Sequence, residues 1–427
     1  MQRNVSKNLQ EWAENKNRKP LIISGARQIG KSWVVRELGK NFYQQNFLEV
    51  NFEKTPAINQ IFEADLDPKR IIQELEIQYQ IEVTQDTLLF FDEIQNCPKA
   101  IMALRYFYEE LPHIPVIAAG SLLEFQLKNI PFPVGRVEHL EMQPMSFDEF
   151  LLANGNNALV KLRQEPFYEM PQSVEDKLYS ELLNYYWVGG MPECVKHFAD
   201  NRNYVAVRKI QQDLIYTYTQ DFAKYNPLVN KDCLLDILNS VATSVGNQTI
   251  YTKLSERFSS PTIKKGVEVL IMAKILTKID NVSIANLPFT VSGKQFKMYF
   301  LDIGLLLCMA KVPYQNLMQE KNLNAVFTGA WAEQFVAQSF ACKHSQNLCY
   351  WARTAKNSNA EVDFVTEHEG EIVPIEVKYG ASGRLRSLHQ LMLENPQISR
   401  AIIYSKAKLG IQDNLHFIPI YYAGKLK

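Results

Sequence analysis

The stretch GARQIGKS, residues 25–32, decides the fold of the first part of the chain. It follows the apolar run LIIS and leads into WVVRELGK, which has the periodicity of a helix. Glycines at Gly25 and Gly30 let an anion approach backbone N–H groups at the start of that helix, and Lys31 can reach a terminal phosphate. The stretch therefore predicts a phosphate-binding loop between a strand and a helix.

The other residues of this loop complete a predicted site for ATP and Mg2+. The stretch has the form G-x-x-x-x-G-K-[ST], in which the hydroxyl of Ser32 binds the metal ion. The positive end of the helix dipole adds to the attraction for phosphate. The residues expected to line the nucleotide are Gly25, Ala26, Arg27, Gln28, Ile29, Gly30, Lys31, Ser32 and Trp33.

A second motif, TLLFFDEIQ at residues 87–95, reads as a buried strand that ends in two carboxylates. In a parallel sheet the carboxyl end of such a strand lies beside the phosphate loop. There Asp92 can hold the magnesium ion through water, and Glu93 can orient or deprotonate the attacking water. Either motif alone has a structural explanation, such as an acidic strand cap. Together they predict Mg2+-dependent hydrolysis of ATP.

A third apolar strand, IPVIAAGS at residues 114–121, ends in small and polar residues. If it lies next to the Asp92 strand, Ser121 comes near the terminal phosphate as a polar sensor of hydrolysis. The alternative is that Ser121 caps a helix over LLEFQL. Further on, Arg136 follows Gly135, and it either stabilises transition-state charge in its own or a neighbouring subunit or is a surface arginine.

Seven motifs resemble, in this order, a prokaryotic family of AAA-type ATPases that carries a C-terminal domain of unknown function: ISGARQIGKS, LLFFDEIQNCPKA, VIAAGSLLEF, GRVEHLEMQPMSFDEFL, YYWVGGMPECV, YTYTQDFAKY and KMYFLDIGLL. The resemblance covers nearly the whole chain. It implies an AAA-like core in which Lys31 and Ser32 contact phosphate and magnesium, Asp92 and Glu93 form the Walker B pair, and Ser121 takes the sensor place. It implies no function beyond ATP binding.

Composition bounds the rest of the interpretation. The chain has 427 residues, which exceeds the roughly 100 to 200 residues of one domain. The 46 basic and 46 acidic residues cancel, so net charge predicts no partner. No apolar run approaches the length of a membrane span, and the polar start has no signal-peptide core, so we expect a cytoplasmic protein. The six cysteines form no C-x-x-C pair, which argues against a zinc site and a disulfide framework.

The middle of the chain reads as helical and then as a winged helix. Aromatic residues in YYWVGGMPECV suggest core packing, and the glycine pair Gly189 and Gly190 is expected to turn one helix into the next. Between residues 231 and 301 three helix-like segments precede a hairpin, which is the order of a winged helix-turn-helix. Pro261 and Thr262 start the third of these helices, and Lys264 and Lys265 lie near that end, so the segment either reads DNA or mediates protein contacts.

The last part of the chain resembles the restriction-endonuclease-like core from Thr328 onward. Glu333 lies on a helix-like segment, Asp363 ends the run AEVD, and Glu376 and Lys378 form E-x-K on the next strand, as a PD-(D/E)xK nuclease requires. Asp363 and Glu376 would bind magnesium, Glu333 would assist, and Lys378 would polarise water or phosphate. The alternatives are a binding module on the same fold and an exposed pair at a strand edge.

The predicted fold is α/β, with an AAA-like P-loop NTPase parallel sheet, a helical and winged-helix middle, and a PD-(D/E)xK-like core. The corresponding ranges are 1–155, 156–230, 231–325 and 326–427. One hypothesis is an ATPase that couples nucleotide state to action on DNA, helped by the basic stretch from Lys378 to Lys408, which is otherwise a solvated face. The rival hypothesis is an ATP-dependent switch that docks a protein partner on a non-catalytic scaffold. The oligomeric state stays open.

Overall fold

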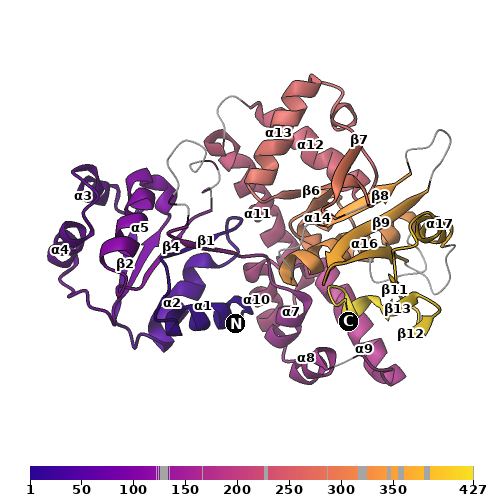
Figure 1. Ribbon diagram of the computed structural model, residues 1–427, viewed down its shortest axis with the longest axis horizontal. Helices are drawn as coiled ribbons and strands as arrows, with labels where there is room; N and C mark the ends of the chain where they lie inside the picture. The colour runs from indigo at the N-terminus through magenta and orange to yellow at the C-terminus, as the bar shows by residue number, and fades with distance from the viewer. Residues whose placement is uncertain are drawn as a thin grey trace. The chain divides into compact units, whose positions relative to one another are not determined.

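The chain forms two compact units in a computed structural model (Figure 1). The residues that the structure describes are 1–121, 123, 125, 133, 135–165, 167–225, 229–285, 287–315, 325–343, 348–353, 360–378 and 385–426. The N-terminal unit comprises Met1–Gln143 with Met272–Lys274, and the C-terminal unit comprises Pro144–Ile271 with Ile275–Lys427. The structure thus draws its boundary after residue 143, where the sequence suggested 155.

The N-terminal unit alternates strands with helices. Its elements are α1 (Val5–Glu14), β1 (Leu21–Ser24), α2 (Lys31–Asn41), β2 (Phe47–Asn51), η1 (Pro56–Asn59), α3 (Gln60–Glu63), α4 (Pro68–Tyr79), β3 (Leu88–Asp92), η2 (Ile94–Asn96), α5 (Pro98–Glu110), β4 (Val116–Ala119) and β5 (Glu138–Glu141). The strands join in the order β2-β3-β4-β1-β5, and every pair is parallel. The predicted parallel sheet is confirmed.

Alternating side chains of this sheet are buried on both of its faces. Ile22, Leu89 and Phe91 belong to a core that includes apolar residues of α3, α4 and α5, while α2 packs against β3 and β4. Register aligns the strand ends, because Ala119 pairs with both Ile23 and Asp92. The residues that follow β1, β3 and β4 therefore lie side by side at the carboxyl ends of the parallel strands.

The C-terminal unit begins with helices and ends in a mixed sheet. Its elements are α7 (Phe147–Ala153), α8 (Asn157–Gln164), α9 (Gln172–Val188), α10 (Pro192–Asn201), α11 (Tyr204–Tyr225), α12 (Lys231–Ser244), η3 (Tyr251–Lys253), α13 (Ser260–Met272), β6 (Leu276–Ser283), β7 (Thr290–Phe300), α14 (Ile303–Met309), α16 (Ala325–Lys343), β8 (Cys349–Ala352), β9 (Glu361–His368), β10 (Glu371–Val377), α17 (Arg386–Glu394), β11 (Ala401–Ser405), β12 (Gly410–Gln412), β13 (Leu415–Pro419) and η5 (Ile420–Tyr422). Helix α7 packs on α8, α9 and α10, which places it in this unit.

The eight strands of this sheet lie in the order β12-β13-β11-β10-β9-β8-β6-β7. Strands β9 and β10 form the antiparallel hairpin expected for Asp363 and Glu376. The hairpin β6–β7 is the far edge of the same sheet, because Asn281 of β6 pairs with Tyr350 of β8. The predicted ranges 231–325 and 326–427 thus share one sheet, and Figure 1 shows β6 and β7 continuing beside β8 and β9.

The predicted second helix of the middle segment is reduced to the single turn η3. Downstream of it, Ser255 Oγ donates to Asp236 Oδ2 at 2.8 Å, and the guanidinium of Arg257 binds the same carboxylate. These side chains tie the segment to α12, which keeps it from continuing as a helix. The assignment of residues 231–325 as a winged helix stays a prediction.

The glycine pair between α9 and α10 lies where backbones meet. Gly190 N–H donates to Asp302 Oδ2 at 2.6 Å, and Gln338 Nε2 donates to the same oxygen at 3.0 Å. A Cβ at Gly189 would lie 2.1 Å from Asp302 Oδ1, and one at Gly190 would lie 2.1 Å from the carbonyl oxygen of Met145. The pair turns α9 into α10 as predicted, and only glycine fits this junction.

All six cysteines are free thiols. Burial raises the pKa of Cys97 and of Cys349 to about 11, so both are protonated and unreactive near neutral pH. Among the residues that the structure describes, no helix is long and apolar enough to cross a membrane.

Candidate functional site

The loop between β1 and α2 is a tight turn in which three residues have positive φ. Gly25, Gln28 and Gly30 have φ values of 138°, 62° and 92°, all in the region that favours glycine. A Cβ at Gly25 would lie 2.4 Å from the carbonyl oxygen of Met142. Gly30 precedes the first turn of α2, whose free N–H groups and dipole attract negative charge.

The side chain of Lys31 is held by neutral groups of its own loop. Its Nζ donates to the carbonyl oxygens of Gly25 at 3.0 Å and Ala26 at 2.8 Å. Burial lowers the pKa of Lys31 to about 8, against the nearby charges of Glu93 and Asp92, which raise it. The ammonium group is thus desolvated and carries a charge that its direct partners do not neutralise.

Asp92 ends β3 beside this loop and accepts hydrogen bonds from neutral donors. Ser32 Oγ donates to Asp92 Oδ1 at 2.8 Å, and Asn51 Nδ2 donates to Asp92 Oδ2 at 3.1 Å. The guanidinium of Arg36 lies 3.7 Å from Oδ2 and binds Glu49 more closely, at 2.7 Å. Burial raises the pKa of Asp92, and the hydrogen bond from Ser32 lowers it by a smaller amount. The structure thus brings Ser32 and Asp92 together.

Glu93 stands directly after β3 in the left-handed region, with a φ of 51°. Gln95 Nε2 donates to Glu93 Oε2 at 2.5 Å, while Gln95 Oε1 is buried and has no partner among the described residues. Gln95 was missed in the sequence analysis. Its signal was weak: it is the polar residue that follows the carboxylates in FFDEIQ.

Two serine hydroxyls are buried at the same edge of the sheet. Gly120, which precedes Ser121, donates its N–H to the carbonyl oxygen of Ile23, which precedes Ser24. The Oγ atoms of Ser24 and Ser121 are buried and have no partner within the described part of the chain. The sensor role of Ser121 stays a prediction, and most of the helix that it would cap lies outside the described residues.

These residues fit a nucleotide with its magnesium ion. Hydroxyl and carboxylate oxygens of Ser32 and Asp92 are the ligand type that Mg2+ takes. The buried hydroxyls of Ser24 and Ser121 lack partners among the described residues, and a polar ligand or water could supply them. Lys31 adds a cation whose ammonium group lies against carbonyl oxygens of this loop.

The other residues of the predicted loop differ in exposure. Arg27 lies 4.0 Å from Glu53, and the side chains of Gln28 and Trp33 are exposed. Ile29 is fully buried, and its Cδ1 would lie 2.5 Å from a Cβ at Gly25. Ile29 therefore supports the loop from the core.

Arg136 lies at the opposite end of the sheet. It precedes Glu138, which pairs with Leu21 at the start of β1, whereas the phosphate loop follows the end of β1. The side chain is exposed and binds Glu109 at 2.8 Å. The expectation that Arg136 serves its own subunit's nucleotide does not fit this geometry, because the length of β1 separates the two. A role towards a neighbouring subunit stays a prediction.

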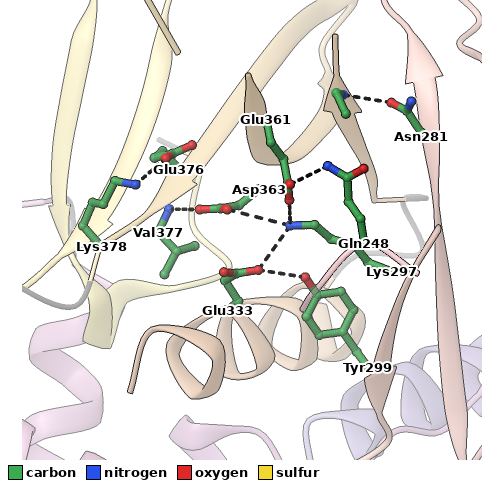
Figure 2. Close-up of polar contacts among 11 residues, drawn as sticks. Gln248, Asn281, Lys297, Tyr299, Glu333, Glu361, Asp363, Glu376, Val377 and Lys378 are labelled. Atoms are coloured by element: carbon green, nitrogen blue, oxygen red, sulfur yellow. Dashed lines mark hydrogen bonds and ion pairs between the residues drawn. The ribbon is translucent and has the colours of Figure 1, made fainter. Parts of the chain in front are cut away.

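The C-terminal unit gathers the four residues predicted for a nuclease site (Figure 2). Phe364 of β9 pairs with Ile375 of β10, so Asp363 and Glu376 occupy the next positions on the two strands. Val377 N–H donates to Asp363 Oδ2 at 2.7 Å. Glu333 reaches the cluster from α16, which packs against β10 and β7, and Figure 2 shows it pointing towards Asp363.

A fifth residue, Lys297 of β7, lies among these carboxylates and was missed in the sequence analysis. Its Nζ lies 2.6 Å from Glu361 Oε1, 3.3 Å from Glu333 Oε2 and 3.8 Å from Asp363 Oδ1. The side chain is 1% exposed. The available signal was a lysine within the apolar strand run FKMYF. Lys297, Glu333, Glu361 and Asp363 are called the carboxylate cluster below.

Neighbouring polar groups complete this cluster. Tyr299 OH donates to Glu333 Oε2 at 3.1 Å, and Gln248 Nε2 donates to Glu361 Oε2 at 2.5 Å. Burial raises the pKa of Glu333 to about 8, and the charge of Asp363 adds to this. Burial disfavours the charge of Lys297, but Glu333, Tyr299 and Asp363 outweigh it and raise the pKa of Lys297 well above its ordinary value.

Glu376 and Lys378 form a separate ion pair beside the cluster. Lys378 Nζ binds Glu376 Oε1, while Glu376 Oε2 is buried and has no partner among the described residues. Burial raises the pKa of Glu376 to about 7, helped by Asp363. Within the described ranges, no group of three or more His, Cys, Asp or Glu side chains is arranged to hold a metal ion. The assignment of Asp363 and Glu376 as magnesium ligands stays a prediction.

The basic residues considered for DNA contact are largely paired or dispersed. Lys408 binds Glu169 at 2.8 Å, and Arg400 lies 3.4 Å from Glu371. Part of the stretch, residues 379–384, lies outside the described residues. Lys264 is exposed on α13, whose apolar side chains face the core. The local excess of positive charge is thus partly neutralised by acids from other segments.

Three family models match successive parts of the chain. Residues 17–151 match the model of an AAA domain. This match supports an ATPase of the AAA type. Residues 179–316 match a domain of unknown function (DUF8612), and residues 328–423 match another (DUF4143). Neither description assigns an activity to the C-terminal unit.

Similar proteins add little beyond the AAA domain. An uncharacterized protein of Methanocaldococcus jannaschii is 22% identical over 411 residues, which cover 93% of this chain and 86% of that protein. The RuvB Holliday junction branch migration motor of Thermotoga maritima matches with a TM-score of 0.32 and 16% identity, over 68% of this chain and 92% of that one. AMPPCP-bound DnaA from Aquifex aeolicus matches with a TM-score of 0.28 and 11% identity, over 62% and 86%. Likeness at this level says nothing of this chain's ligands or partners.

Proposed function

We propose that this chain is a Mg2+-dependent ATPase whose active centre is the edge of the AAA domain's sheet. The observation that carries the proposal is the contrast in contacts there. Lys31 binds only carbonyl oxygens of its loop, at 2.8 and 3.0 Å, while Ser32 and Asp92 are joined at 2.8 Å. A desolvated cation stands beside a hydroxyl–carboxylate pair, which is the arrangement that a metal-bound triphosphate needs.

Each residue then has a defined task. Lys31 neutralises charge on the terminal phosphate, and Ser32 and Asp92 hold the magnesium ion, directly or through water. Glu93 orients the attacking water and accepts its proton, while Gln95 holds the Glu93 carboxylate in place. When bound, the magnesium ion supplies positive charge to the phosphate oxygens. Ser121 contacts the terminal phosphate as a sensor.

Two substitutions test this assignment. Lys31→Ala should abolish nucleotide binding, whereas Glu93→Gln should retain ATP and lower turnover by about 100- to 1000-fold, the size expected when one preorganised catalytic group is lost. Binding is measured with a fluorescent ATP analogue and turnover by phosphate release. Lys40→Ala, at an exposed position of the same helix, is the matched control and should behave as the wild type. Wild-type turnover in Lys31→Ala would show that the site is wrong.

Of the two processes that ATP could control, the geometry favours docking of a protein partner over DNA cleavage. We infer that ATP controls docking of a protein partner and that the nuclease-like C-terminal unit is a non-catalytic scaffold. The supporting observation is Lys297, which lies within 3.8 Å of Asp363 and Glu333, two of the carboxylates predicted for the nuclease site, and of Glu361. In the second candidate function, action on DNA, Lys264 and Lys265 would contact phosphate.

DNA binding separates the two outputs. Fluorescence anisotropy with labelled single-stranded and duplex DNA at about 50 mM salt should show no binding if the output is a protein partner. Binding that weakens with salt, with a log-log slope of about 0.9 per contacted phosphate, and that falls in Lys264→Ala with Lys265→Ala, would favour DNA. Partners are then sought by pull-down with Glu93→Gln in ATP, with Lys31→Ala as the nucleotide-free control.

A further inference from the structure

Lys297 is a buried lysine with more carboxylates around it than one charge can neutralise. Glu361, Glu333 and Asp363 approach its Nζ at 2.6, 3.3 and 3.8 Å, from α16 and from two positions of β9. A lysine side chain is almost never fully buried unless it is paired. The cluster as a whole therefore holds this lysine inside the protein.

The position of the ammonium group is that of a shared cation. Figure 2 shows Nζ between Glu361 above and Glu333 below, with Asp363 to one side. Divalent ions such as Mg2+ and Mn2+ take carboxylate oxygens as ligands, so such an ion would compete for the same oxygen atoms. A second positive centre beside the ammonium group is disfavoured in a buried site, because the repulsion between the two is weakly screened there.

Other polar groups and a second lysine also bind the carboxylates of the predicted nuclease site. Asp363 Oδ2 accepts from Val377 N–H at 2.7 Å, and Glu333 Oε2 also accepts from Tyr299 OH at 3.1 Å. Glu376 pairs with Lys378 rather than with the cluster. The residues of the nuclease motif are thus present, but they are divided between two lysines.

We propose that Lys297 is the resident cation of the carboxylate cluster, so that the C-terminal unit binds no divalent metal ion there while this lysine is present. The ammonium group takes the place that a metal ion bound by Glu361, Glu333 and Asp363 would hold. Removing its charge opens a divalent cation site formed by Glu361, Asp363 and Glu333. This proposal concerns the C-terminal unit alone, and it stands or falls independently of the ATPase proposal.

The test counts bound Mn2+ by electron paramagnetic resonance, with the full chain and no nucleotide. We expect the wild type and Asp363→Asn to bind equal amounts of Mn2+, because the cluster takes none in either. Lys297→Met removes the charge and keeps an unbranched side chain, and it should bind one more Mn2+ per chain than the wild type. Adding Asp363→Asn should abolish that gain. Lys294→Met, at an exposed position of the same strand, should bind as the wild type does.

Two outcomes overturn the proposal. One is a wild type that binds one Mn2+ more than Asp363→Asn, and the other is a folded Lys297→Met that binds no more than the wild type. Far-UV circular dichroism decides whether Lys297→Met is folded. If it is not, Lys297→Gln combined with Glu333→Gln keeps the cluster's net charge and is compared with the wild type in the same way. The comparison of the wild type with Asp363→Asn needs no lysine variant.

Discussion

The two units each place a lysine near carboxylates, but the two lysines have opposite partners. Lys31 donates to carbonyl oxygens of its own loop, and the nearby Asp92 accepts from Ser32 and Asn51. Lys297 lies directly among three carboxylates. The same residue types therefore give a lysine available to an anion in one unit and a lysine held by carboxylates in the other.

The pKa values of the two lysines express this difference. Both side chains are buried, and burial disfavours the charged form of each. The pKa of Lys31 falls to about 8, since Glu93 and Asp92 do not offset burial. That of Lys297 rises well above its ordinary value, since Glu333, Tyr299 and Asp363 outweigh burial. What surrounds a lysine decides whether its charge remains available to a ligand.

The largest expected effect comes from removing the charge of Lys297. Lys297→Met should lower the free energy of unfolding by about 3 to 5 kcal/mol, because it leaves buried carboxylates without their cation. Chemical denaturation measures this loss. Adding Glu333→Gln should recover part of it, while Lys294→Met should not change stability. An unchanged midpoint in Lys297→Met would break the comparison, since the cluster would then not depend on its lysine.

A smaller effect is expected in the pH dependence of stability. The pKa of Glu333 is about 8 in the folded chain against an ordinary 4.5, so the folded state binds one more proton between these values. The free energy of unfolding should therefore fall as pH rises through this window, by about 1 to 3 kcal/mol. Glu333→Gln should flatten that slope in denaturation curves, and Glu367→Gln, an exposed site on β9, should not. An equal slope in the wild type and Glu333→Gln would contradict the assignment.

Replacing Lys31 should affect stability much less than replacing Lys297 does, but it should abolish the effect of ATP. Lys31→Met should change the free energy of unfolding by no more than about 1 kcal/mol without nucleotide, because a desolvated charge with only neutral partners is replaced by an apolar chain. ATP should then no longer raise the melting temperature, whereas it should do so for the wild type. A loss of stability as large as that in Lys297→Met would remove the contrast between the two lysines.

Arg136→Ala should have the smallest effect. The side chain is exposed and lies at the edge of the sheet away from the phosphate loop. We expect no measurable shift of the melting temperature and no change in phosphate release from dilute protein. A fall in turnover that appears only at high protein concentration would indicate that Arg136 serves a neighbouring subunit. A fall at every concentration would contradict its placement.

The AAA domain could be read from the sequence because its site is built from contiguous residues. GARQIGKS carries its own glycines, lysine and serine, and the carboxylates of FFDEIQ follow their strand directly. Parallel strands then align their carboxyl ends, so local motifs suffice to place Lys31, Ser32, Asp92 and Glu93 at one edge. The hairpin that carries Asp363 and Glu376 was predictable for the same reason, since its partners lie close in sequence.

Only the tertiary structure decided the partners of residues that contact distant segments of the chain. Lys297 contacts Glu333, which is 36 residues away, because α16 packs against β7. It contacts Glu361 and Asp363 because β7 and β9 belong to one sheet. Gly190 donates its N–H to Asp302, which is 112 residues away in the sequence. The role of Arg136 stayed open because a motif gives the identity of a residue but not the end of the sheet at which it lies. Periodicity and spacing specify local backbone, whereas the partner of a buried charge is set by packing, which no short stretch of sequence contains.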